Sequence, residues 1–212
     1  MKETTRNILK ELGVRYPVLQ GILSDVEGAF TILKNAYDEG KILYVCGNGG
    51  SCSDSEHIVG ELMKSFKKKR PLPVEMQEKL ASFGEKGERL SATLENGLRA
   101  VSLCGHSGLS TAYANDRDPM LVFAQQVSGW GREGDVLMTL STSGNSQNCV
   151  YAALVAKAKG MKTIALVGGM GGELKTLCDV SIVAPEKETY KVQELHLPIY
   201  HCLCAMLEEE FF

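Results

Sequence analysis

A glycine-rich turn, followed by a stretch that carries a histidine and a glutamate, is the part of this sequence best suited to chemistry. The apolar run 43–46 leads into Gly47–Ser51 (GNGGS), and His57 and Glu61 come next. Glycine lets the backbone turn sharply and approach a ligand closely, and free N–H groups at a helix N-terminus attract anions. His57 and Glu61 are four residues apart and share one face of a helix. The segment predicts an anion-binding turn with a titratable pair behind it.

A second polar turn, Ser141–Ser146 (STSGNS), follows another apolar run at 135–140. Hydroxyls occur at Ser141, Thr142, Ser143 and Ser146. Hydroxyls and backbone N–H groups can surround a phosphate without help from Lys or Arg. Capping of the following helix by Asn145 or Ser146 is the alternative, but one cap explains one hydroxyl and not the whole set. We therefore interpret this turn as a phosphate site.

A second polar pair lies near the end of the chain. Gln193 and His201 are eight residues apart, a little over two helical turns, so they lie on roughly one stripe. Together with His57 and Glu61 they could form a set of metal ligands or an acid–base set. Pro198 lies between them and could kink the helix, which weakens the spacing argument. The alternative for His57 and Glu61 is an exposed polar helix face.

The elements that must position these residues alternate along the chain. Apolar runs predict strands at 42–46, 100–104, 135–140, 162–167 and 180–184. Amphipathic stretches predict helices at 3–14, 17–39, 51–66, 107–115, 119–130, 146–159, 171–177 and 188–210. This rhythm is typical of an α/β domain with a parallel sheet covered by helices on both faces. Both turns then lie at the carboxyl ends of strands, where such sheets bind ligands, and the nearby segment 114–116 lies at the same edge.

Three segments have other interpretations. The polar segment 71–98 is expected to be a surface insertion with one or two short helices, or else a lid or subunit contact. An apolar stripe at spacings of three and four runs through 18–37, and we expect it to pack against other subunits. The basic run 67–70 is expected to be a solvated helix C-terminus, with a weak anion or partner patch as the alternative.

The composition sets bounds on function. The chain has 212 residues, enough for one domain with a full core, and its net charge of −3 does not indicate a nucleic-acid partner. There is no apolar stretch long enough for a membrane span and no signal peptide, so we expect a cytoplasmic protein.

The seven cysteines are expected to be reduced, and a metal clip at Cys202 and Cys204 is disfavoured by their directions on a helix. His106 and His196 are expected to be ordinary polar or partly buried residues. Neither a GxGxxG dinucleotide motif nor a Walker motif is present.

Taken together, these motifs resemble those of the phosphoheptose isomerases, single-domain members of the sugar isomerase (SIS) family. The resemblance rests on Cys46–Ser51, His57 with Glu61, Ala114–Asp116, Gly131–Leu137, Ser141–Ser146, and Gln193–His196 with His201. It covers the chain from about residue 40 to the end. It implies one SIS domain over 1–212, with a five-stranded parallel sheet in a flavodoxin-like three-layer sandwich and an N-terminal helical segment, 1–40, used for oligomerisation.

The resemblance also implies an activity and roles for residues. The expected reaction converts sedoheptulose 7-phosphate to D-glycero-D-manno-heptose 7-phosphate through an enediol, early in the synthesis of bacterial heptose-containing surface glycans, in a cytoplasmic homotetramer with sites between subunits. Glu61 and His201 would transfer the protons. The substrate would be bound by Asn48, Gly49, Gly50, Ser51, Glu61, Asn115, Asp116, Ser141, Thr142, Ser143, Ser146 and Gln193. One Zn²⁺, either catalytic or stabilising, would be held by His57, Glu61, Gln193 and His201.

Two other functions are compatible with the same turns. A related SIS protein is a non-enzymatic tetrameric scaffold that binds the bacterial replication initiator, and it lacks a histidine at the position of His201. This chain has both Glu61 and His201, which favours the enzyme. A sugar-phosphate sensor is the third hypothesis. Two departures from the family pattern, the 71–98 insertion and Pro198, leave the exact sugar open.

Overall fold

The sheet determines where every functional segment lies, and it has five parallel strands. The computed structural model describes residues 1–212. The strands are β1 (Leu43–Gly47), β2 (Ala100–Ser102), β3 (Val136–Ser141), β4 (Lys162–Gly168) and β5 (Val180–Ala184). Their order in the sheet is β2-β1-β3-β4-β5, the flavodoxin-like order that we expected. The predicted strand positions are confirmed, although β2 is two residues shorter than predicted.

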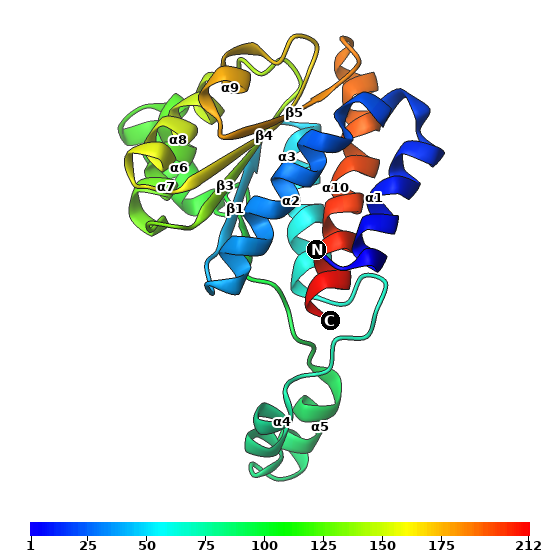
Figure 1. Ribbon diagram of the computed structural model, residues 1–212. Helices are drawn as coiled ribbons and strands as arrows, with labels where there is room; N and C mark the ends of the chain where they lie inside the picture. Colours follow the sequence, from blue (N-terminus) through cyan, green and yellow to red (C-terminus); the bar gives the residue numbers. More distant parts are fainter.

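Helices cover both faces of this sheet and make a three-layer molecule (Figure 1). One face carries α2 (Leu23–Asp38), α3 (Gly50–Met63) and α10 (Thr189–Phe211), with α1 (Glu3–Arg15) packed against α10. The other face carries α7 (Val122–Trp130), α8 (Gln147–Ala158) and α9 (Gly172–Leu177). Alternate strand residues enter two separate cores: Val45 and Met138 enter the first, and Tyr44 and Leu137 enter the second. This alternation is the period-two pattern of a strand that is buried on both faces.

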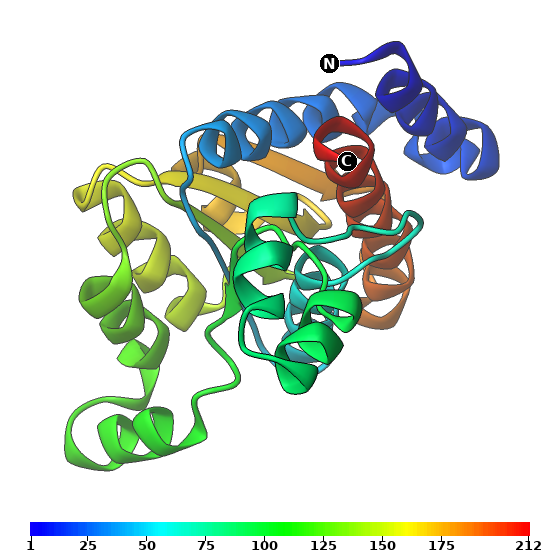
Figure 2. The same cartoon turned by 90° about the horizontal axis from the view of Figure 1, so that it is seen from below.

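The remaining helices lie at the edges of the domain (Figure 2). They are η1 (Pro17–Ile22), α4 (Val74–Ala81), α5 (Glu85–Thr93), α6 (Ser107–Asp116) and η2 (Pro119–Leu121). The predicted helix over 17–39 is therefore a 3₁₀ turn followed by α2, and the one over 119–130 is divided in the same way. The helix predicted over 51–66 ends at Met63. Helix α10 runs without a break through the buried Pro198, so the proline does not end the helix.

The apolar stripe in 18–37 packs inside its own chain, contrary to our expectation. Val26, Phe30 and Leu33 are between 0% and 1% exposed and belong to the first core. Val18, at 52% exposed, is the member left outside. The stripe is needed because α2 covers the sheet beside β5, and a helix over a sheet must bury one full face.

The polar segment 71–98 forms two helices, as predicted. Helices α4 and α5 pack on each other and stand away from the domain (Figure 1), and α4 contains no buried residue. A bridge between Pro71 and Glu95 closes the base of this hairpin. Its role as a lid or subunit contact stays a prediction. None of the helices in the chain combines the length and apolar character needed to cross a bilayer, and all seven cysteines are free, as expected.

Candidate active site

The two polar turns lie side by side because their strands are neighbours. Strand β1 pairs with β3, and Gly47 lies opposite Leu140 at the carboxyl ends. A pair of amide side chains joins the turns: Asn48 Nδ2 donates to Asn148 Oδ1 at 2.9 Å, and Asn148 Nδ2 donates back to Asn48 Oδ1 at 2.8 Å. The sequence interpretation missed Asn148. Its position in the first turn of the helix after the serine-rich turn was the local feature that could have identified it.

The first turn depends on close backbone packing. A Cβ on Gly47 would lie 2.7 Å from the carbonyl oxygen of Ser51, and Gly49 has a positive φ of 56°. Both positions therefore favour glycine. Helix α3 begins at Gly50, and its N-terminus opens at this rim. Ser51, which was predicted to contact the substrate, is 3% exposed and lies buried beneath the turn. Asn48, Gly49 and Gly50 are the exposed members.

The second turn presents hydroxyls rather than a helix cap. Ser141 and Ser146 share a hydrogen bond of 2.8 Å between their Oγ atoms, and Ser146 makes no side-chain cap to α8. Ser143 Oγ accepts from the N–H of Asn145 at 3.2 Å and remains exposed. Gly144 has a positive φ of 69°, and a side chain there would collide with the backbone of Gly171. The turn is thus held from behind at the N-terminus of α8; Ser141 is only 3% exposed, and Ser143 presents the exposed hydroxyl that an anion could reach.

His57 is the centre of the second group of predicted residues. Its Nε2 lies 3.1 Å from Glu61 Oε1 and 3.5 Å from His201 Nε2. Its Nδ1 lies 3.0 Å from the hydroxyl of Tyr200, which donates to Asp54 Oδ1 at 3.1 Å. The structure therefore brings Glu61 and His201 of one chain to the same imidazole. Tyr200 and Asp54 were not predicted, although Asp54 lies about one turn before His57 on α3.

Electrostatic surroundings favour a neutral His201 and a protonated Tyr200. Burial lowers the pKa of His201, the neighbouring His57 lowers it further, and Glu61 opposes both effects. Burial raises the pKa of Tyr200 well above its usual range, and the charge of Asp54 adds to the increase. Burial also raises the pKa of Asp54, against the hydrogen bond from Tyr200. A neutral imidazole beside a carboxylate is a suitable proton acceptor at neutral pH.

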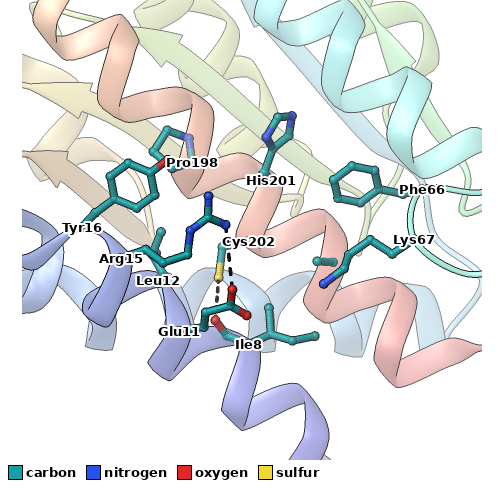
Figure 3. A pocket seen from close by; sticks show the side chains of 11 residues that line it. Ile8, Glu11, Leu12, Arg15, Tyr16, Phe66, Lys67, Pro198, His201 and Cys202 are labelled. Carbon is teal, nitrogen blue, oxygen red and sulfur yellow. Dashed lines mark hydrogen bonds and ion pairs between the residues drawn. The ribbon is translucent and has the colours of Figure 1, made fainter.

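A hollow of about 350 Å³ reaches His201 from the side of α1 (Figure 3). Residues from α1 and α10 line most of it, and Phe66 and Lys67 close one side. His201 thus lies between this hollow and His57. Solvent or a ligand group can therefore approach the imidazole from the α1 side.

Gln193 lies away from the group around His57. Its side chain packs on the first turn, and a Cβ on Gly50 would lie 2.6 Å from Gln193 Nε2. His201 follows eight residues later on the same helix, about 12 Å along the axis. The four predicted zinc ligands therefore do not converge in this chain, and no group of three or more His, Cys, Asp or Glu side chains is arranged to hold a metal ion. The distances from His57 Nε2 to Glu61 Oε1 and to His201 Nε2, 3.1 and 3.5 Å, are compatible with neighbouring ligand atoms of one tetrahedral ion.

Asn115 and Asp116 are not brought to either turn. Both are exposed at the end of α6, and Asn115 Nδ2 donates to Asp116 Oδ1 at 3.0 Å. Helix α6 has no buried residue and lies at the periphery of the molecule (Figure 2). Within one chain, the prediction that these residues line the sugar site therefore has no support. They are placed where another subunit could meet them.

The basic run 67–70 lies beyond the end of α3 and is not a helix C-terminus; its three lysines are not buried, but Arg70 is fully buried. Its Nε lies 2.7 Å from Glu208 Oε1, and its other nitrogens donate to the carbonyls of Leu62 and Glu61. Burial raises the pKa of Glu208, but backbone N–H groups of Phe66 and Lys67 and the bond from Arg70 outweigh it and lower the pKa. Arg70 thus holds the C-terminal end of α3, where Glu61 lies.

Comparison with known proteins gives a consistent result. A family model described as the SIS domain matches residues 90–168. A phosphoheptose isomerase of a Nitratiruptor species is 40% identical over 171 residues, which cover 81% of this chain and 78% of that protein. A phosphoheptose isomerase of Akkermansia muciniphila is 32% identical over 212 residues, covering 100% of this chain and 99% of that protein.

The fold comparison agrees with the sequence comparison. The structure of a phosphoheptose isomerase from Neisseria gonorrhoeae superimposes with a TM-score of 0.73 at 26% sequence identity. The match covers 97% of this chain and 94% of that one. The similarity therefore includes the N-terminal helices and α10 as well as the sheet with its two turns.

Proposed function

Because the chain belongs to the phosphoheptose isomerases of the SIS family, we propose that it interconverts sedoheptulose 7-phosphate and D-glycero-D-manno-heptose 7-phosphate. The chain is a sugar-phosphate isomerase. The choice of heptose, and a place early in the synthesis of heptose-containing surface glycans, are the proposed part. The observation that carries the proposal is the convergence of Glu61 and His201 on His57.

The two groups of residues would divide the work. The hydroxyls of Ser141, Ser143 and Ser146 and the N-terminus of α8 would bind the phosphate without a permanent charge. Glu61 and His201 would move a proton between C1 and C2 and manage the oxygen protons of the enediol. His57 would orient both groups, since its two ring nitrogens are engaged by Glu61 and Tyr200.

The spacing along α10 favours sites that are built between subunits of a homotetramer. Gln193 lies at the first turn, and His201 lies about 12 Å further along the helix. A phosphate turn from one chain and an acid–base group from another would shorten this gap, and the exposed Asn115 and Asp116 would contribute from a neighbour. Light scattering that gives a tetramer mass would support this arrangement.

Mixed oligomers test the shared site directly. One chain would carry Glu61→Gln, and the other would carry alanine at Ser141, Ser143 and Ser146. Each parent is expected to be nearly inactive. If a site takes its phosphate turn and its Glu61 from different chains, the mixture regains activity. If both come from one chain, no mixture does.

A zinc ion would fit this proposal without being required by the geometry. His57, Glu61 and His201 would hold it, and Gln193 would have to move from Gly50 to join them. When bound, zinc would polarise the substrate oxygens as a Lewis acid. Elemental analysis of the purified protein, compared with His57→Ala, measures whether these residues hold the metal.

The activity is tested by incubating the purified protein with sedoheptulose 7-phosphate and following the aldose by NMR. Glu61→Gln serves as the control for contaminating isomerase. Formation of D-glycero-D-manno-heptose 7-phosphate that depends on Glu61 would support the proposal. Binding of the sugar phosphate without turnover would favour the sensor or scaffold hypothesis instead.

A further inference from the structure

A second hollow lies at the opposite end of the sheet from the two turns. Ile42, Arg99 and Asp135 each come directly before a strand, and β2, β1 and β3 are neighbours in the sheet. All three residues line a hollow of about 840 Å³. This size is within the range of small-molecule sites in proteins. None of the residues assigned to the isomerase reaction lines it.

Positively charged side chains dominate this hollow. They are Lys41, Arg99, Arg132 and Lys159, against the carboxylates of Glu39 and Asp135. None of the four forms an ion pair with a carboxylate. Three of them are held by backbone carbonyls: Lys41 by Glu133, Arg99 by Gly40, and Lys159 by Ser128. The side chain of Arg132 makes no hydrogen bond within the chain and is exposed.

The nearby carboxylate of Asp135 is already used. It accepts the backbone N–H of Ile42 at 3.0 Å and that of Arg132 at 2.9 Å, and it is 4% exposed. Asp135 therefore fixes the starts of β1 and β3, and it forms no ion pair with Arg99 or Arg132. This also explains the segment Gly131–Leu137, to which the isomerase reaction gives no role.

Both guanidinium groups act on one buried hydroxyl. Burial and the charge of Asp135 raise the pKa of Tyr44, and the charges of Arg99 and Arg132 oppose that increase. Tyr44 lines the hollow and donates to the carbonyl of Trp130 at 3.3 Å. Arg99 and Arg132 line the same hollow as Tyr44, so two guanidinium groups are available to one polyanion.

An aromatic wall completes the hollow. The rings of His106 and Trp130 meet edge to face with centroids 4.5 Å apart, and Trp130 is 39% exposed. An edge-to-face contact with His106 leaves the indole with surface free for stacking on a planar ring. The hollow therefore offers a planar apolar surface beside unpaired cations.

We propose that this hollow is a second ligand site that takes a nucleoside phosphate, with the phosphates on Arg99 and Arg132 and the base on Trp130. A purely anionic ligand would leave the aromatic wall unused, and a neutral ring would leave the cations unpaired. The site is distinct from the turns at the carboxyl ends of the strands. The inference does not depend on the isomerase reaction, because it shares no residue with it.

The chain contains a single tryptophan, Trp130, so its fluorescence reports on this hollow alone. The full-length protein would be titrated with ADP, adenosine and tripolyphosphate, with isothermal calorimetry as a second measurement. We expect saturable quenching by ADP, at least tenfold weaker binding of adenosine and of tripolyphosphate, and at least tenfold loss of ADP affinity in Arg132→Ala. The size of that loss follows from removing one hydrogen-bonded charge.

Two controls separate this site from the others. Arg89→Ala removes an exposed cation from α5, and Ser143→Ala alters the predicted phosphate turn; both should keep the ADP affinity of the unaltered protein. Arg99→Ala is a second variant of the hollow and should weaken ADP as Arg132→Ala does. The proposal is overturned by no saturable binding, by equal affinities for ADP and tripolyphosphate, or by loss of ADP binding in Ser143→Ala but not in Arg132→Ala. These results leave the isomerase assay unchanged, so the two proposals fail separately.

Discussion

The two ends of the sheet differ in the polar groups that they present. At the carboxyl ends, the turns of β1 and β3 offer hydroxyls, amides and the N-termini of α3 and α8. At the amino ends, Lys41, Arg99, Arg132 and Lys159 lie near the C-termini of α2, α7 and α8. Helix N-termini are partially positive and helix C-termini partially negative. The carboxyl end can therefore bind an anion with dipoles alone, whereas the amino end needs full charges.

This difference has a consequence for catalysis. The predicted phosphate turn contains no lysine or arginine, but Glu61 has one cationic neighbour: Lys64 Nζ lies 3.2 Å from Glu61 Oε2. A cluster of cations at that end would favour the ionised carboxylate and make it a weaker base. The larger group of cations, formed by Lys41, Arg99, Arg132 and Lys159, is instead at the other end of the sheet.

Replacing Glu61 with Gln should lower turnover at the carboxyl-end site more than any other change described below. Loss of an acid–base group lowers turnover by about 10²–10⁴-fold, and KM should change little because the phosphate turns are intact. Steady-state kinetics with sedoheptulose 7-phosphate measure both constants. Glu56→Gln, an exposed change on the same helix, is the matched control. Near-normal turnover in Glu61→Gln would reject its role.

Arg70 belongs to neither of the two proposed ligand sites. Replacing it tests whether a buried cation stabilises the fold. Its removal in Arg70→Met leaves the buried Glu208 without its partner, and breaking such a pair costs about 3–5 kcal/mol. We expect urea denaturation to show a loss of this size in the free energy of unfolding. Lys69→Met, a change at an exposed neighbour, should stay close to the unaltered protein. Equal stabilities for the two variants would contradict the structural role.

The sequence was sufficient for the sheet and for the turns, because both leave local signals. Five apolar runs with polar helices between them determine a parallel sheet, and Gly49 and Gly144 have the positive φ that glycine permits. Ser141 and Ser146 could be assigned to one turn because they are only five positions apart in sequence. Helices, strands and turns are determined mainly by residues that are close together in sequence.

The partners that were missed are far apart in sequence. Asn48 meets Asn148 across 100 residues, Tyr200 meets Asp54 across 146, and Arg70 meets Glu208 across 138. Each pairing is set by which strands and helices are adjacent, and no local pattern carries that information. The basic run 67–70 was misassigned for this reason, since its last residue is recruited by the final helix. Asn115 and Asp116 were also placed at the site from sequence, but in this chain they bond to each other at the exposed end of α6.

The buried His196 should make the free energy of unfolding depend on pH. It is 0% exposed, donates to the carbonyl of Val167, and has no partner for Nδ1. Burial lowers its pKa from 6.5 to about 4. The unfolded chain therefore binds a proton between pH 6.5 and 4 that the folded chain does not, so stability is fully present above pH 6.5 and falls as the pH falls to 4. The loss should reach at most about 3 kcal/mol.

The measurement is the free energy of unfolding in urea at several pH values, for the unaltered protein and for His196→Gln. The variant should be less stable at neutral pH but should lose less on acidification. His106→Gln, a change at a half-exposed histidine, should keep the full acid slope. If His196→Gln and the unaltered protein lose the same free energy between pH 6.5 and 4, the buried imidazole does not titrate as described.

The smallest predicted effect is that of Ser143→Ala, in the turn Ser141–Ser146 that is proposed to bind the phosphate without a charged side chain. Ser143 Oγ is exposed at the second turn and already accepts the N–H of Asn145, so its O–H is free to donate to a phosphate oxygen. A hydrogen bond to a charged group is worth about 1.5–3 kcal/mol, and the remaining hydroxyls and helix N–H groups would compensate for part of it. We expect KM to rise roughly tenfold at nearly constant turnover, since the bond is made equally in the ground and transition states. Ser82→Ala in the turn after α4 is the control and should leave KM unchanged. A fall in turnover at constant KM would mean that Ser143 acts on the reacting carbons, and the division between a phosphate-binding turn and a separate acid–base group would then be wrong.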